Sequence, residues 1–386
     1  MEIPSLINIK GKIMLKKLIG GLFIISISFG QTTANPQFSV VGDLIMNDLH
    51  NNPNLYSSGI EIAVQGYVNP FARADVYLHK HNDESALELE EAVMTIERGL
   101  PFGLGLRVGK FRPDLGKINK DHAHLFPFIE APSGMANILG KEFWAGTGLE
   151  ASIFLPLPWY SNISIGSFDS GLGDHDHGIE KEDVHNDHKD EDAHEDKDEH
   201  VDEHDHEKNE KVFSARWGHF FELSDINLME IGTSYYKGSE SSLMGADFKY
   251  KWRPNKYRSL TIQGEIVQLS IKEEHHEEDH EEDHEEDHEE EVHNGEYKNK
   301  SDAGYLMINY QFNKSFNFGI IGDYYKETYK ETEINPSIFF GFSPVEESTV
   351  FRLKIGQVED HKSHKKHLKT TAQIIWSLGP HKPHRY

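Results

Sequence analysis

An alternation of apolar and polar side chains runs through most of the 386-residue chain, and it is the feature that most restricts the fold. Residues 58–68, for example, read SGIEIAVQGYV, with an apolar side chain at every second position of the central part. Alternation with period two is typical of strands that have one apolar and one polar face. No stretch of useful length has helical periodicity. The sequence therefore predicts an all-β fold.

We predict sixteen strands, joined alternately by short turns and by long or polar connections such as 47–57 and 112–141. The predicted strands are 38–45, 58–68, 72–78, 87–96, 104–111, 147–155, 162–167, 212–223, 227–236, 243–252, 260–271, 303–312, 316–325, 337–342, 349–356 and 370–378. This arrangement is typical of outer-membrane barrels, whose sheet must close because lipid cannot pair its edges. We therefore expect a transmembrane antiparallel up-and-down β-barrel of about 16 strands, with a soluble β-sandwich as the alternative.

The N-terminal residues have the pattern of a secretory signal peptide. Lys16 and Lys17 precede the apolar run 18–29 (LIGGLFIISISF), and small residues follow it. This run is too short for a membrane-spanning helix, which needs about 20 residues. Cleavage after Ala34 or after Gly30 fits the pattern, and Met14 is a candidate initiator. We expect residues 1–34 to be the signal peptide and 35–386 to form a barrel in the bacterial outer membrane.

Two acidic, histidine-rich insertions interrupt the barrel pattern, at 174–211 and 273–296. The first holds eight histidines, eighteen carboxylates and five lysines, and the second has fourteen carboxylates within 273–291. Together they carry a formal charge of about −27, and the chain total is −26, so the rest of the chain is nearly neutral. Such acidity argues against nucleic acid as a partner, because phosphate binding needs clustered Lys and Arg. If the N-terminus is periplasmic, both insertions and the connection 112–141 lie on extracellular loops.

The insertions have the composition of metal-binding segments. Imidazole and carboxylate without thiolate suit Zn²⁺, with Cu²⁺ or Ni²⁺ as alternatives, and the chain has no cysteine. We expect many weak, exchanging sites on disordered loops that order partly when metal binds. The alternative is solvated low-complexity acid that only sets the surface charge. The candidate ligands are His175, His177, His185, His188, His194, His200, His204, His206, His275, His276, His280, His284, His288, His293, His122 and His124.

The second insertion also matches the zinc-protease pattern H-E-x-x-H, from His276 to His280 and again from His280 and His284. That chemistry needs an amphipathic helix and a third ligand in a dry cleft, whereas the flanks here carry only charge. We therefore interpret the match as a by-product of the repeat. The sequence predicts that the protein is not an enzyme.

Charged residues of both signs lie on the polar faces of the predicted strands. Such residues line a water-filled channel in one interpretation and only bridge across the barrel wall in the other. The candidate channel-lining residues are Arg73, Asp75, Arg107, Lys249, Arg352 and Lys354.

Four stretches resemble a known family. They are 35–46 (NPQFSVVGDLIM), 106–124 (LRVGKFRPDLGKINKDHAH), 155–160 (LPLPWY) and 378–384 (LGPHKPH). The chain resembles the bacterial outer-membrane receptors labelled zinc-regulated and TonB-dependent, which are porin-like, and 108–117 is also similar to phosphate-selective porins. The resemblance implies a role in zinc uptake across the outer membrane. A strand is predicted directly after the signal peptide, so the resemblance does not extend to a plug domain or, with it, to TonB coupling.

These observations predict a porin-like receptor that captures Zn²⁺ on extracellular loops and aids its uptake. Its expected partners are outer-membrane lipid, divalent metal ions and a periplasmic zinc-binding protein. Two alternatives remain open: a general porin of the anion or phosphate type with incidental acidic loops, and a surface metal buffer with a closed lumen.

Overall fold

The computed structural model describes residues 36–49, 52–81, 86–172, 211–272, 299–328, 330–345, 348–359 and 366–379. The predicted signal peptide and both acidic insertions, with their fourteen candidate histidines, lie outside the described residues, apart from Lys211 at the end of the first insertion.

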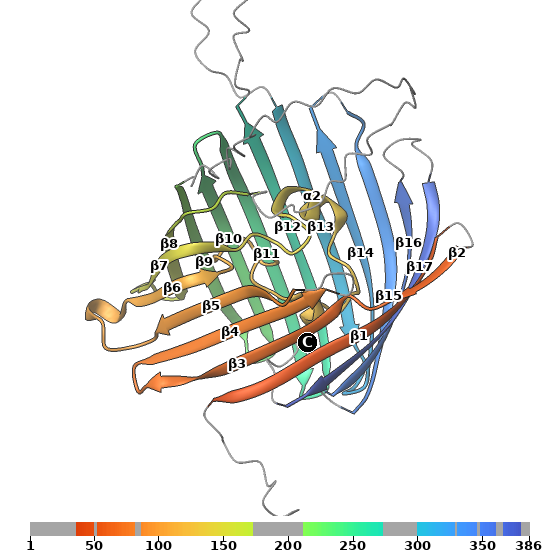
Figure 1. The fold of residues 1–386 in the computed structure, drawn as a ribbon, viewed down its shortest axis with the longest axis horizontal. Coiled ribbons are helices and arrows are strands. Elements are labelled where there is room, and N and C mark those ends of the chain that lie inside the picture. The colour runs from red at the N-terminus through yellow and green to blue at the C-terminus, as the bar shows by residue number, and fades with distance from the viewer. Residues whose placement is uncertain are drawn as a thin grey trace, which may run out of the picture.

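The described residues form one closed antiparallel barrel of 16 strands (Figure 1). The strands are β1 (Gln37–Leu49), β2 (Asn52–Tyr56), β3 (Gly59–Asn69), β4 (Ala72–His81), β5 (Glu88–Ile96), β6 (Gly105–Phe111), β7 (Gly146–Leu155), β8 (Tyr160–Phe168), β9 (Val212–Ser224), β10 (Asn227–Lys237), β11 (Ser241–Asn255), β12 (Arg258–Ile271), β13 (Asn299–Gln311), β14 (Phe316–Glu327), β15 (Glu333–Val345), β16 (Thr349–Glu359) and β17 (Lys366–Leu378). The first strand pairs with the last and closes the ring. The predicted fold class is therefore confirmed.

Two of these segments, β2 and β3, together make one strand of the barrel, because both pair antiparallel with β1. The chain bends between them at Ser57 and Ser58, where Oδ1 of Asp43 accepts the backbone N–H of Ser58 at 2.8 Å. The predicted long connection 47–57 is therefore wrong: most of its residues belong to β1 and β2. Paired strands that extend beyond the alternating pattern are held by backbone hydrogen bonds, which do not depend on side-chain polarity.

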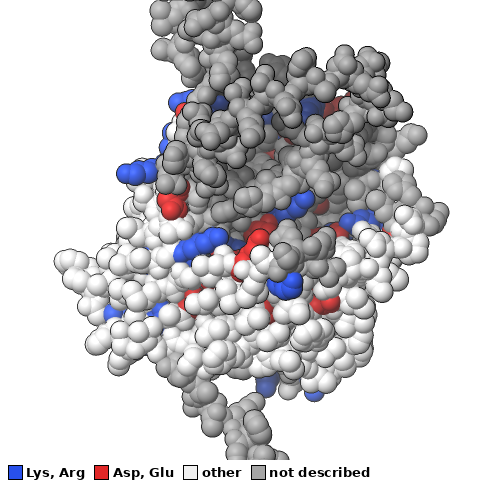
Figure 2. Space-filling model, in the orientation of Figure 1, with Lys and Arg blue, Asp and Glu red and all other residues white. Residues whose placement is uncertain are grey.

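The barrel wall is apolar on its outer face, as lipid requires, and carries charged side chains on its inner face. Ile320 and Ile338 are neighbours on β14 and β15 and are each 46% exposed. Asp247, Glu265 and Arg352, by contrast, are buried in the interior. In Figure 2, Lys, Arg, Asp and Glu gather around the recess in the middle of the visible face, while the lower face is mostly white. No helix among the described residues is long and apolar enough to cross a membrane.

The connection between β6 and β7, residues 112–145, folds into the barrel, and we call it the inward segment. It contains a short 3-10 turn, η2 (Ala123–Leu125), and the helix α2 (Ser133–Leu139), which lies against β13 and β14 (Figure 1). The sequence did not predict that this connection packs inside the barrel, and its place on the extracellular side stays a prediction. A second 3-10 turn, η1 (Pro101–Gly103), lies in the short connection from β5 to β6.

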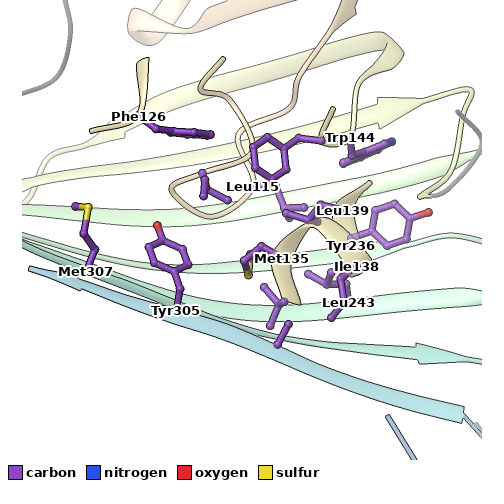
Figure 3. Packing of buried hydrophobic residues seen from close by; sticks show 14 of the residues in the cluster. Leu115, Phe126, Met135, Ile138, Leu139, Trp144, Tyr236, Leu243, Tyr305 and Met307 are labelled. Atoms are coloured by element: carbon purple, nitrogen blue, oxygen red, sulfur yellow. The ribbon is translucent and has the colours of Figure 1, made fainter. Parts of the chain in front are cut away.

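Apolar packing explains why the segment lies inside. Its buried side chains contact apolar residues that point inward from the barrel wall (Figure 3). From the segment these include Leu115, Phe126, Met135, Ile138, Leu139 and Trp144, and from the wall Tyr236, Leu243, Tyr305 and Met307. A loop with this many apolar side chains buries them because exposure to water is unfavourable by about 25 cal/mol per Å².

Candidate metal-binding site

Polar contacts fix the inward segment to the barrel wall on several sides. Oε2 of Glu265 on β12 accepts the backbone N–H of Lys117 at 3.0 Å. Nη2 of Arg352 on β16 donates to the carbonyl oxygen of His124 at 2.9 Å. Nζ of Lys369 on β17 donates to both carboxylate oxygens of Glu130, at 2.8 and 3.0 Å. The segment is therefore held in one position within the barrel.

A cavity of about 420 Å³ lies between the inward segment and the wall formed by β1, β3 and β17. The wall contributes Asp43, Glu61 and Gln373, and the inward segment contributes His122 and His124. Imidazole and carboxylate groups thus line one cavity, and these are the ligand types that bind divalent transition-metal ions.

His122 is the centre of a cluster of carboxylates. It is 2% exposed, and its Nδ1 lies 3.0 Å from Oε2 of Glu61 and 3.5 Å from Oε2 of Glu90. On the other side of the ring, Nε2 lies 2.9 Å from Oε1 of Glu91. Nδ1 of His124 lies 3.4 Å from Oε2 of Glu61. Glu61, Glu90 and His122 each offer a ligand atom, and these atoms lie within 4.8 Å of one another.

A β-bulge brings two consecutive glutamates to the same histidine. In the register of β4 and β5, Tyr77 pairs with Glu91 and Leu78 pairs with Leu89, so Glu90 is the extra residue. A bulge changes the direction of a side chain that would otherwise point to the opposite face. Both Glu90 and Glu91 therefore point inward to His122.

Electrostatics set the protonation of this histidine. Burial lowers the pKa of His122 and Arg112 lowers it further, but the negatively charged carboxylates of Glu61 and Glu90 close to Nδ1 outweigh both. The pKa of His122 consequently lies well above its ordinary value. Arg112 itself forms an ion pair with Glu90 and donates from Nη1 to the carbonyl oxygen of Asp121 at 2.9 Å.

A second group of possible ligands lies at the end of β4. It consists of His79, His81 and Glu142, whose ligand atoms also lie within 4.8 Å of one another. The rings of His79 and His81 are 4.1 Å apart between centroids, and His79 and Glu142 line the same cavity as His122 and His124. These four histidines therefore lie in or next to one cavity.

Among the predicted ligands that the structure describes, His122 and His124 are brought together, with ring centroids 5.8 Å apart. His122 is buried and His124 is partly buried inside the barrel. That their connection belongs to the extracellular side stays a prediction. Sequence reasoning missed Glu61, Glu90 and Glu91. Only the consecutive glutamates at 90 and 91, which interrupt an alternating strand, gave a signal that could have found two of them.

The six predicted channel-lining residues all lie close to charged or polar groups of the barrel wall or of the inward segment. Nη2 of Arg73 lies 2.8 Å from Oδ1 of Asp75, and Nη1 of Arg107 lies 3.1 Å from Oε1 of Glu150. Lys249 is opposite Glu230 in the register of β10 and β11. Arg352 and Lys354 face the inward segment, Lys354 at 4.0 Å from Glu130. That these residues line an open channel stays a prediction.

Comparisons with known proteins agree on the architecture. The chain has 9% sequence identity with OprB of Pseudomonas putida in its high-pH structure, with a TM-score of 0.56 over 89% of this chain and 94% of that chain. It has 8% identity with an anion-selective porin from Comamonas acidovorans, with a TM-score of 0.55 over 89% and 98%. At such low identity these likenesses establish the fold alone. The fold is that of outer-membrane porin barrels.

Sequence comparison does not narrow the assignment beyond the porin-barrel fold. No family model matches the chain. One relative is an uncharacterized protein of Aquifex aeolicus, 32% identical over 100 residues that make up 26% of this chain. The match spans 20% of that relative's length. Membership of the zinc-regulated receptor family therefore stays a prediction.

Proposed function

We propose that this protein is an outer-membrane porin-like channel that captures Zn²⁺ on external His/Asp/Glu-rich loops and aids its passage to the periplasm. Its immediate partners would be membrane lipid, divalent metal ions and a periplasmic zinc-binding protein. The observation that carries the proposal is that the strand ends flanking the acidic insertions lie at the same end of the barrel as the described histidine–carboxylate clusters.

The strand register supports this placement. The first insertion leaves the barrel between Phe168 and Val212, which are paired on β8 and β9. The second leaves it between Ile271 and Asn299, which are paired on β12 and β13. In an up-and-down barrel every second connection lies at the same end, and the connection that follows His81 on β4 belongs to this set. Metal gathered by the insertions would therefore reach the barrel end at which His81 lies.

The charge of the insertions gives them a means of concentrating cations. Their carboxylates attract divalent ions electrostatically, and a charged surface raises the local counter-ion concentration. Imidazole adds nitrogen ligands that are mostly unprotonated at neutral pH and therefore able to bind metal. This combination favours Zn²⁺ over Mg²⁺ and Ca²⁺, which prefer oxygen ligands alone.

A general porin is the second candidate. The likeness in fold to an anion-selective porin and the inward cations Arg216, Lys249 and Arg352 favour it. Against anion selectivity, the guanidinium of Arg216 is paired with Asp247, with Nη2 to Oδ1 at 2.9 Å. A cation that is already paired attracts a passing anion weakly.

Zinc influx into liposomes tests the proposal. The purified protein is reconstituted with a zinc-sensitive dye inside, and a variant has short Gly/Ser linkers in place of residues 176–208 and 275–296. We expect the variant to admit Zn²⁺ more slowly at low external Zn²⁺ and to keep its potassium chloride conductance, because the barrel strands are intact. Equal zinc influx at every concentration would favour the general porin.

A matched control separates imidazole from charge. In a third variant the fourteen histidines of the insertions are replaced by asparagine, and every carboxylate is kept. If imidazole captures the metal, this variant behaves like the deletion. If it behaves like the wild type, the insertions act through charge alone, and the capture of Zn²⁺ by histidine is contradicted.

A further inference from the structure

We propose that Glu61, Glu90 and His122 form a binding site for a divalent transition-metal cation inside the barrel, through which the cargo ion passes; this rests on the proposed function. The three ligands come from β3, β5 and the inward segment, so the site joins the barrel wall to the segment that narrows it. It is separate from the acidic insertions.

The separations of the ligand atoms fit a tetrahedral metal ion. Nδ1 of His122 is 3.0 Å from Oε2 of Glu61 and 3.5 Å from Oε2 of Glu90. Ligands that each lie about 2.1 Å from Zn²⁺ at tetrahedral angles are roughly 3.4 Å from one another. Both distances from Nδ1 are close to this value, and all three ligand atoms lie within 4.8 Å of one another.

Two of these atoms lack a well-formed hydrogen bond. In the part of the chain that the structure describes, Nδ1 of His122 and Oε2 of Glu90 are both buried, and neither makes a hydrogen bond of favourable geometry. A buried polar atom that has close charged neighbours but no well-aligned hydrogen bond is less stable than one that is fully hydrogen-bonded, so such atoms call for an explanation. A cation bound between them satisfies both atoms together with the nearby oxygen of Glu61.

Glu91 orients the histidine for this role. Its Oε1 lies 2.9 Å from Nε2 of His122, and its Oε2 accepts the backbone N–H of Arg112 at 3.2 Å. A carboxylate that accepts the N–H of one ring nitrogen directs the lone pair of the other nitrogen toward the metal, as in many zinc sites. A metal ion that binds here displaces the proton from Nδ1, and the hydrogen bond from Nε2–H to Glu91 then leaves Nδ1 as the metal ligand.

The charge around the site is also suited to a cation. Glu61, Glu90 and Glu91 supply three carboxylates, and Arg112 is the cationic side chain that pairs with Glu90. Unbalanced buried negative charge is unfavourable, and a divalent ion offsets it. His124 and cavity water can supply a fourth ligand, since Nδ1 of His124 is 3.4 Å from Glu61. A site with three protein ligands and an exchangeable fourth ligand releases its metal ion more readily than a site with four fixed protein ligands, which suits an ion in transit.

Thermal unfolding separates this site from the insertions. Because its ligands are brought together from distant parts of the sequence, the site exists only in the folded barrel, and a ligand that binds only the folded state raises Tm. The insertions hold their ligands close together in sequence and are expected to bind metal in the unfolded chain as well, which cancels their effect on Tm. We expect Zn²⁺ at about 100 times its dissociation constant to raise the Tm of the full chain by about 5 °C.

The variants are chosen to keep size and packing. Glu90→Gln and Glu61→Gln should each reduce the zinc-dependent rise in Tm to less than about 1 °C, since each removes an anionic ligand. Glu230→Gln is the matched control, because Glu230 forms an ion pair with Lys117 of the same segment but lies outside the cluster. It should keep the full rise. Mg²⁺ should give no rise in any of them, because it prefers an octahedral set of oxygens.

An equal zinc-dependent rise in the wild type and in Glu90→Gln would overturn the proposed site, whatever the liposomes show. Loss of the rise in Glu90→Gln, combined with zinc influx that ignores the insertions, would overturn the capture function and support the site. Anomalous diffraction at the zinc edge from crystals of the full chain gives a second readout that does not depend on variant folding. A peak between Glu61, Glu90 and His122 is expected, and its absence in zinc-soaked crystals overturns the proposal.

Discussion

Glu265 and Lys117 join the barrel wall to the inward segment: Oε2 of the glutamate accepts the backbone N–H of the lysine residue at 3.0 Å. The same oxygen accepts the N–H of Ile118 at 3.3 Å, and Glu265 is 3% exposed. One buried side chain thus satisfies two backbone donors of a segment that has no strand partner at that point. This contact is one of several that hold the segment inside the barrel.

Glu265→Leu should therefore loosen the inward segment. It leaves two buried N–H groups without an acceptor, at a cost of about 1–3 kcal/mol each in the free energy of unfolding. We expect a lower Tm and a noisier or larger single-channel conductance in planar bilayers. Glu265→Gln is the control, because its amide oxygen still accepts a hydrogen bond. Equal stability of the Leu and Gln variants would contradict the anchoring role.

Gly116 should tolerate no larger residue. Its φ is +60°, and a Cβ at this position would collide with the carboxylate of Glu265. Gly116→Ala should therefore lower the free energy of unfolding by more than the roughly 1–2 kcal/mol of a left-handed alanine alone. Gly103 is the matched site, because its φ is +69° and no atom lies within 4 Å of the place that a Cβ would take. If denaturant titration gave Gly103→Ala and Gly116→Ala the same loss, the close approach to Glu265 would not matter.

The contacts that Asp114 makes between the inward segment and the barrel wall should weaken at low pH. Burial raises the pKa of Asp114, but Lys120 and Arg216 lower it more strongly, to about 2 from an ordinary 3.8. Because the folded-state pKa is depressed, this carboxylate stabilises the fold above its unfolded pKa, and the contribution is lost as pH falls from about 4 to about 2. The loss is on the order of 2 kcal/mol.

The measurement is the free energy of unfolding in detergent as a function of pH for the wild type and Asp114→Asn. The variant should be less stable near neutral pH and should lose less stability on acidification. Parallel curves for the two proteins would show that Asp114 does not carry this dependence.

A charged residue on the outer face of β14 or β15 should destabilise the barrel in lipid. Ile320 and Ile338 are adjacent across these strands and exposed, so lipid would cover both. Ile320→Lys should cost about 2–4 kcal/mol at the bilayer midplane and should reduce folding into lipid vesicles, measured by heat-modifiable migration on gels. Ile320→Leu should fold like the wild type. A lysine variant that inserts equally well would place this face in water.

The strands were predictable from the sequence because lipid outside and polar groups inside impose strict alternation. At 58–68 the polar set includes Glu61, which the structure places inside the barrel. Nothing in that pattern distinguishes Glu61 from any other inward carboxylate, because its role depends on His122, more than sixty positions later in the chain. Contacts between residues that are distant in sequence do not change the apolar–polar alternation within a strand, so the alternation cannot reveal them.

The inward segment could not be placed from periodicity, because a connection has no fixed period. Its composition held a clue, since Phe126, Phe128 and Met135 are apolar residues in a stretch that no lipid covers. The bulge at Glu90 held another, because two adjacent glutamates cannot both face inward in a regular strand. The acidic insertions, by contrast, were evident from composition, and their role stays a prediction.

The cavity beside His122 borders on β1 and β17, the two strands whose pairing closes the barrel. Val41 and Asp43 from the beginning of the chain and Gln373 and Ile375 from its end stand in the same wall. A half-made barrel would therefore have no such chamber. The cavity forms only when β1 pairs with β17, so closing the barrel and completing the chamber are a single event.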